Sequence, residues 1–217
     1  MKTYIWSLPT RVFHSCLVLF IVITYISGDD DYLKIHSVFG YGIGVLILFR
    51  LLWGKIGPKY SNFKDFNLSF KEALNYSKDI LLKKDTKIYA GHNPAASFVL
   101  YFLLITIGIV VLTGLLALGE EPNKGYFKFL NTSIFEDIHE IIANLMLILI
   151  AVHISGVLLD RFLHKEHGTL QSIVFGYKNI SGESVVLSFK QKIVSFLFFC
   201  LMLFIMYLTA TDFDHLF

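Results

Sequence analysis

Residues 136–161 read EDIHEIIANLMLILIAVHISGVLLDR, an apolar segment with charged residues at both ends and two histidines inside it. Its length and composition predict a helix that crosses a membrane. His139 and His153 are fourteen residues apart, so in an α-helix they lie on one face and about 21 Å apart along the axis. This is about two thirds of a hydrocarbon core of roughly 30 Å, which places one imidazole near each side of the bilayer. Two histidines at two depths indicate two ligand positions.

The composition of the whole chain points to a membrane protein. Hydrophobic residues make up 55% of the 217 residues and charged residues only 17%, a balance that points away from a soluble domain. No alternating strand pattern is present, so an all-α bundle of membrane-spanning helices is expected. The first apolar stretch has no small-residue cleavage site, so we expect it to be retained rather than removed as a signal peptide. The expected spans cover residues 12–28, 35–53, 95–118, 137–159 and 190–209.

Charge is distributed unevenly between the loops. Basic residues gather in the loop from Gly54 to His92 and after the fourth span: Lys55, Lys59, Lys64, Lys71, Lys78, Lys83, Lys84, Lys87, Arg161, Lys165, Lys178, Lys190 and Lys192. Acidic residues gather in the other loops: Asp29, Asp30, Asp31, Glu120, Glu121 and Glu136. The positive-inside rule therefore predicts a multi-pass protein of the bacterial inner membrane, with a cytoplasmic N-terminus and a periplasmic C-terminus.

The other spans supply histidines at matching depths. His14 lies near the inner end of the first span, and His36 lies near the outer end of the second. The fourth span runs from outside to inside, so His139 is its outer and His153 its inner histidine. The depths therefore pair His14 with His153 and His36 with His139. Arg50 follows His36 by fourteen residues, on the same helix face and near the inner side.

Two pairs of facing imidazoles suit haem b, because its iron takes one axial ligand above and one below a flat ring. Zinc would need four ligands at one site, and a proton relay would more often include carboxylates, which the span interiors lack. Gly28, Gly40, Gly42 and Gly44 fit a porphyrin lying against backbone, although small residues in membrane helices also serve close packing. Two roles are open for Arg50: an ion pair with a haem propionate, or snorkelling to the inner interface.

Several motifs together resemble the prokaryotic cytochrome b561 family, which includes the b-type cytochrome subunits of nickel–iron hydrogenases. They are WSLPTRVFH (6–14), HSVFGY (36–41), RLLWGKIG (50–57), GHNP (91–94) and DIHE (137–140) with His153. The resemblance covers roughly residues 4–180. It implies a four-helix core with two haems b, held from the first, second and fourth spans, and an electron carrier between the quinone pool and a redox partner. Carried over by position, His14, His36, His139 and His153 become the ligands.

The connecting segments give further expectations. Ser69-Phe-Lys-Glu72 is a capping-box pattern that opens a helix over residues 69–84, either at the membrane interface or as a plain soluble loop helix. Asn93 and Pro94 predict a helix start. His92 either touches the inner haem or a quinone headgroup, or is an interfacial histidine without such a role, which we favour. The third span has no histidine and is interpreted as a wall of the bundle; His164 and His167 are expected to be solvated.

We expect residues 1–180 to form the dihaem domain with four spans, and residues 181–217 to add a fifth helix and a short outer tail. The fifth helix can be assigned only a packing or partner-docking role. The two cysteines, Cys16 and Cys200, lie in separate spans and outside any Cys-x-x-Cys-His motif, which excludes covalent haem attachment by that route.

The predicted function is electron transfer through two haems b between the quinone pool and a redox protein. That partner is a periplasmic c-type cytochrome or a hydrogenase-like or reductase subunit, and whether the chain counts as a quinol:acceptor oxidoreductase subunit stays open. Lipid and quinone are expected contacts, and nucleic acid is not. The alternative is a non-redox membrane anchor or assembly subunit of a respiratory complex. A proton-coupled transporter is disfavoured, since the spans are unbroken and lack carboxylates. Donor, acceptor, direction and oligomeric state are not predicted.

Overall fold

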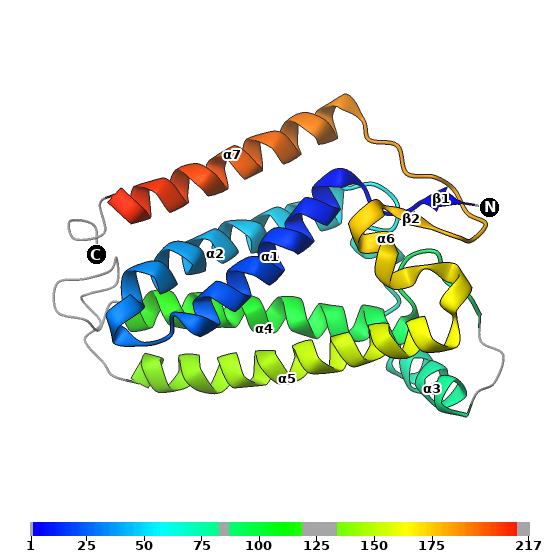
Figure 1. Ribbon diagram of the computed structural model, residues 1–217, viewed down its shortest axis with the longest axis horizontal. Helices are drawn as coiled ribbons and strands as arrows, with labels where there is room; N and C mark the ends of the chain where they lie inside the picture. The colour runs from blue at the N-terminus through cyan, green and yellow to red at the C-terminus, as the bar shows by residue number, and fades with distance from the viewer. Residues whose placement is uncertain (1, 83–86, 119–133, 212–217) are drawn as a thin grey trace. The chain divides into compact units, whose positions relative to one another are not determined.

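The computed structural model describes residues 2–82, 87–118 and 134–211 (Figure 1). Five of its helices are long and apolar enough to cross a membrane, which confirms the expected all-α membrane bundle. They are α1 (Leu8–Ile26), α2 (Leu33–Ile56), α4 (Pro94–Leu118), α5 (Ile134–Leu163) and α7 (Phe189–Thr211). Each begins earlier or ends later than the apolar stretch that predicted it. His14 is therefore in the second turn of α1, not near its first residue.

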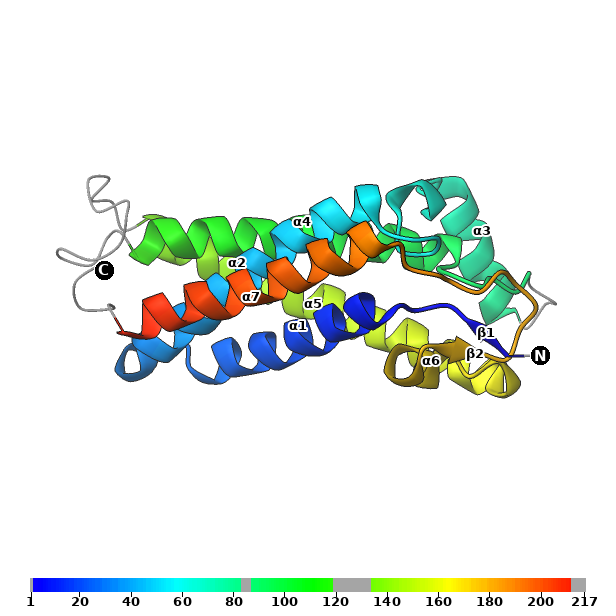
Figure 2. The ribbon, with the colours of Figure 1, turned by 90° about the horizontal axis from the view of Figure 1, so that it is seen from above.

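Shorter elements connect these helices. They are the helices α3 (Phe70–Leu81) and α6 (Thr169–Phe175), the 3-10 turns η1 (Asp30–Tyr32), η2 (Phe63–Asp65) and η3 (Lys165–His167), and the strands β1 (Thr3–Tyr4) and β2 (Tyr177–Lys178). The two strands pair antiparallel, with Thr3 opposite Lys178, and Figures 1 and 2 both show them side by side.

Two helix starts follow the predicted capping. The Ser69 hydroxyl accepts a hydrogen bond from the Glu72 N–H at 3.4 Å at the start of α3. At the start of α4, the Asn93 side-chain oxygen accepts from the Ala96 N–H at 2.8 Å, and Pro94 is the first helical residue. Both residues satisfy N–H groups that a helix start leaves without an intrahelical partner. The expected continuation of α3 through Lys83 and Lys84 lies outside the described residues.

The chain divides into two compact units. Unit 1 comprises residues 1–12, 51–103 and 148–192, and unit 2 comprises residues 13–50, 104–147 and 193–217. Residues on both sides of position 180 pack in unit 1, where Ile180 and Val185 share a core with Ile5 and Trp6. The domain boundary expected at residue 180 stays a prediction.

In unit 1 the N-terminal segment is held by the segment around α6 and β2. The Trp6 indole N–H donates to the Ser172 hydroxyl at 3.0 Å, and the Arg11 guanidinium donates to the Val174 carbonyl at 2.6 Å. The N–H groups of Ile5 and Trp6 both donate to the Gly176 carbonyl, at 2.7 and 3.1 Å. These hydrogen bonds join residues that are more than 160 positions apart in the sequence, and they anchor the start of α1.

A buried cation belongs to the same region. Lys178 on β2 is only 5% exposed, and its ammonium donates to the Gly91 carbonyl at 3.3 Å. Burial lowers the pKa of Lys178 because the charged ammonium loses hydration, and the nearby Asp160 carboxylate partly offsets this effect.

In unit 2, α2 carries more buried apolar residues than any other helix of the described chain, including Leu46 and Phe49, which are each 1% exposed. Phe49 packs against Phe198 and Phe199 of α7, with ring centroids 5.7 and 5.3 Å apart. The fifth span therefore has a packing role within this unit.

Among the described residues, two glycines outside the spans have positive φ, and they make a matched pair for a stability test. Gly176 ends α6 at φ +87°, and an added Cβ would meet the Tyr4 ring and lie 2.9 Å from the Trp6 carbonyl oxygen. Gly168 has φ +68°, and its nearest neighbour would be 3.7 Å away. Gly168→Ala should lower the free energy of unfolding by about 1 kcal/mol, through backbone strain alone. Gly176→Ala should lower it by about 2–3 kcal/mol, because its Cβ would also meet Tyr4 and Trp6. Thermal unfolding of the detergent-purified variants would show this, and equal midpoints would contradict the N-terminal anchoring.

Candidate functional site

Two of the predicted ligand histidines lie close together in unit 2. His36 on α2 and His139 on α5 are both half-buried, and their ring centroids are 6.0 Å apart with the planes inclined at 74°. Metal–nitrogen bonds of about 2 Å on each side put two coordinating nitrogens about 4 Å apart and the ring centres about 6 Å apart. The separation of the two imidazoles would suit two ligands of one iron.

Each of these rings is oriented by a backbone carbonyl of a neighbouring helix. The Nδ1 atom of His36 lies 2.9 Å from the Thr24 carbonyl oxygen, in the last turn of α1. The Nδ1 atom of His139 lies 2.9 Å from the Val110 carbonyl oxygen on α4. A carbonyl oxygen can only accept, so Nδ1 carries the proton and donates in both rings. The lone pair is then on Nε2, the nitrogen available to a metal.

Helix α4 contributes directly to this site, although its sequence holds no histidine. The Thr113 hydroxyl lies 3.2 Å from Nδ1 of His139. The next residue is Gly114, and an added Cβ there would lie 2.9 Å from the Cε1 atom of the same ring. The interpretation of the third span as only a wall was therefore incomplete. The sequence feature that could have indicated a role for α4 is the pair of a polar and a small residue, Thr113 and Gly114, in a mostly apolar helix.

The donor set fits haem better than a metal held by the protein alone. Over residues 2–82, 87–118 and 134–211 there is no group of three or more histidine, cysteine, aspartate or glutamate side chains that could hold a metal ion. A tetrahedral zinc site lacks its donors there, whereas a haem iron needs only two protein ligands.

The four glycines considered for a porphyrin, three on α2 and Gly28 just after α1, divide between open space and packing. Gly40 is one turn from His36, and an added Cβ would meet nothing within 4 Å. Gly42 lies against Phe20 and Met206, at 2.9 Å from an added Cβ, and Gly44 lies against Val111 at 3.3 Å. Gly28 is bordered by the Tyr25 carbonyl at 3.5 Å. Gly40 is thus the glycine with room for a porphyrin, and Gly42 serves close helix packing.

The remaining predicted residues are each placed on a continuous helix. His14 is half-buried on α1 within unit 2, and His153 is half-buried on α5 within unit 1. Arg50 is half-buried on α2. The pairing of His14 with His153 and the propionate role of Arg50 stay predictions.

The histidines outside the spans have protein partners. The ring of His92 lies 4.9 Å from both Trp6 and Phe66, measured between centroids. His164 lies 3.1 Å from the Asp160 carboxylate and stacks on His167 at 5.4 Å. His164 and His167 are both only partly exposed, so the expectation that they are solvated is met in part. His215 lies outside the described residues.

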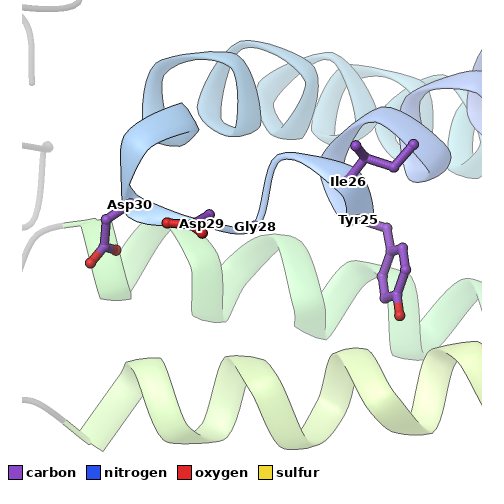
Figure 3. A pocket seen from close by; sticks show the side chains of 5 residues that line it. All are labelled: Tyr25, Ile26, Gly28, Asp29 and Asp30. Carbon is purple, nitrogen blue, oxygen red and sulfur yellow. The ribbon is translucent and has the colours of Figure 1, made fainter.

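A depression at the end of α1 has no histidine in its lining. It is lined by Tyr25, Ile26, Gly28, Asp29 and Asp30 (Figure 3). Of these residues, Asp29 and Asp30 belong to the acidic loop that the charge distribution predicts on the outer side. The other acidic loop residues, Glu120 and Glu121, lie outside the described residues.

A family model described as prokaryotic cytochrome b561 matches residues 5–176. The matched region contains His14, His36, Arg50, His139 and His153, and it ends before α7. No curated protein and no solved structure matches the chain.

The contact between Gly114 and His139 gives a direct test of the site. Gly114→Ala should push the imidazole away from Val110 and lower the affinity for the predicted haem by about tenfold or more, the usual cost of disturbing an outer-shell partner. The measurement is haem per polypeptide in the purified protein. Gly108→Ala on the same helix is the control, because an added Cβ there meets nothing within 4 Å. Equal haem content in the two variants would contradict the role of α4.

Proposed function

Because the chain belongs to the prokaryotic cytochrome b561 family, we propose that it carries electrons through two haems b between the quinone pool and a redox protein. The family itself consists of membrane b-type cytochromes that bind haem b and act in electron transfer, and the chain is a multi-pass bacterial membrane protein. The number of haems, the quinone and the protein partner are the proposal.

The observation that carries the proposal is the pair His36 and His139, with ring centroids 6.0 Å apart and Nδ1 of each ring held by a carbonyl. These residues would hold the outer haem from α2 and α5. A bound haem b supplies one-electron chemistry at its iron. The chain's own part is to fix both rings, to present Nε2, and to keep water away through the apolar helices. The carbonyl bonds also raise the basicity of the imidazole ligands.

The inner haem is assigned to His14 and His153. What supports it is the fourteen-residue spacing of the two histidines on α5, which runs without interruption from Ile134 to Leu163. His14 has the matching depth on α1, by the predicted orientation. Arg50 would pair with a propionate at this depth, because arginines within membrane spans pair with opposite charges or polar groups.

The arrangement in the membrane and the partners follow from charge. We place the N-terminus and the lysine-rich loop in the cytoplasm and the Asp29–Asp31 loop in the periplasm. An acidic periplasmic loop favours a basic protein partner, such as a c-type cytochrome, over an anionic small substrate. A hydrogenase-like subunit is the other partner class, and it would send electrons into quinone rather than take them from quinol. We also propose residues 1–180 as the dihaem domain, with residues 181–217 appended.

The first experiment is a reduced-minus-oxidised absorption spectrum of the detergent-purified protein, with haem per polypeptide measured on the same sample. We expect two haems b, and the loss of one in each of His14→Ala, His36→Ala, His139→Ala and His153→Ala. His167→Ala, outside the spans, is the control and should keep both. A colourless protein from haem-replete cells would reject electron transfer and favour the membrane anchor. One haem per chain would reject one of the two pairs.

A redox titration separates the two roles of Arg50. If its guanidinium pairs with a propionate, Arg50→Gln removes a positive charge near one haem and should lower the reduction potential of that haem, because the oxidised form carries more positive charge. Arg50→Lys is the control and should keep most of the effect. Unchanged potentials in Arg50→Gln would support snorkelling to the interface instead.

A further inference from the structure

Helix α3 has two different apolar faces. Ala73 and Ile80 are each 7% exposed and pack into unit 1. Phe70, Leu74 and Leu81 lie on another face at helical spacing, and their side chains are 64%, 42% and 72% exposed. A soluble loop helix would bury its apolar residues on one face and leave the rest polar. This exposed row, Phe70–Leu74–Leu81, therefore needs an apolar environment outside the protein.

The exposed row is continuous with the surface of a membrane span. The Phe70 ring lies 5.6 Å from the Phe98 ring in α4, and Phe98 lies 4.9 Å from Phe102. Phe102 is 45% exposed on a helix that is apolar enough to cross a membrane. All of these residues belong to unit 1. Because the outward side of such a span contacts lipid, the Phe70 end of the row lies at the edge of the lipid layer.

Two lysines lie beside the row. Lys71 and Lys78 are exposed and two helical turns apart, so both occupy one side of the row. The acidic Glu72 and Asp79 lie further round the helix. Within the part of the chain that the structure describes, neither lysine ammonium is in an ion pair. An apolar row bordered by cations at the level of a membrane surface matches lipid tails below and phosphate groups above.

We propose that α3 is a binding surface for anionic phospholipids of the surrounding bilayer. The side chains of Phe70, Leu74 and Leu81 enter the acyl region, and the ammonium groups of Lys71 and Lys78 bind the headgroup phosphates. This proposal does not depend on haem or on electron transfer. The contact between Phe70 and Phe98 sets how deep α3 lies in the bilayer, and the two lysines give the preference for anionic lipids.

A tryptophan reporter tests the proposal in the full-length protein. Phe70→Trp is reconstituted in phosphatidylcholine vesicles that contain an equal amount of either brominated phosphatidylglycerol or brominated phosphatidylcholine, which both quench tryptophan fluorescence on contact. The native Trp6 and Trp53 are only 6% and 1% exposed and add little quenching. The association constant at the reporter should be larger for phosphatidylglycerol. It should fall about fivefold for each lysine removed in Lys71→Ala and Lys78→Ala, and it should weaken with salt.

Two controls keep the result interpretable. Lys64→Ala removes an exposed lysine from η2, outside α3, and should leave the lipid preference unchanged. Leu81→Trp gives a second reporter if Phe70→Trp does not fold. Equal quenching by the two lipids, or a preference that survives loss of both lysines, would overturn the headgroup assignment. No quenching by either lipid would overturn the proposal as a whole and would point to a protein partner for the row.

Discussion

An imidazole inside a hydrocarbon layer must find partners for both of its nitrogens, because an unsatisfied polar group there costs several kcal/mol. His36 and His139 meet half of this demand through the Thr24 and Val110 carbonyls. The other nitrogen of each ring is left for a metal. The same bonds select the tautomer, so one constraint both orients the rings and prepares the ligand atom. The need for these two carbonyl acceptors also explains why α1 and α4 are required at a site whose histidines come from α2 and α5.

The sequence was sufficient to predict the features that follow from periodicity. Hydropathy located the five long helices, and the shared depth of His36 and His139 predicted the proximity that the structure shows. The acceptors of their Nδ1 protons could not be predicted, since every residue has a backbone carbonyl. Gly114 could not be distinguished from a packing glycine for a similar reason. Its importance comes from the distance to one ring on another helix, and glycine spacing along a single helix does not contain that distance.

Helix boundaries were predicted less well because hydropathy and helix formation are different properties. Apolar residues become continuous only after Arg11, but α1 begins at Leu8 with Pro9 in its first turn, where the missing N–H costs nothing. The anchoring of this helix start was also beyond the sequence. Trp6 and Ser172 are 166 residues apart, and a two-residue strand has no alternation to recognise. Such contacts arise from tertiary packing alone.

The packing of α7 bears on how the fifth span should be regarded. It lies outside the matched family region, yet Phe198 and Phe199 contact Phe49, one of the most buried side chains of unit 2. Met206 and Phe20, from α7 and α1, both approach Gly42 so closely that an added Cβ would force one of these side chains to shift. A helix added to a complete bundle would rest on a lipid-facing surface and would not need a glycine in its neighbour. The close approach at Gly42 therefore indicates that α2 is shaped for α7 as well as for α1, so the appended fifth span packs closely within this unit.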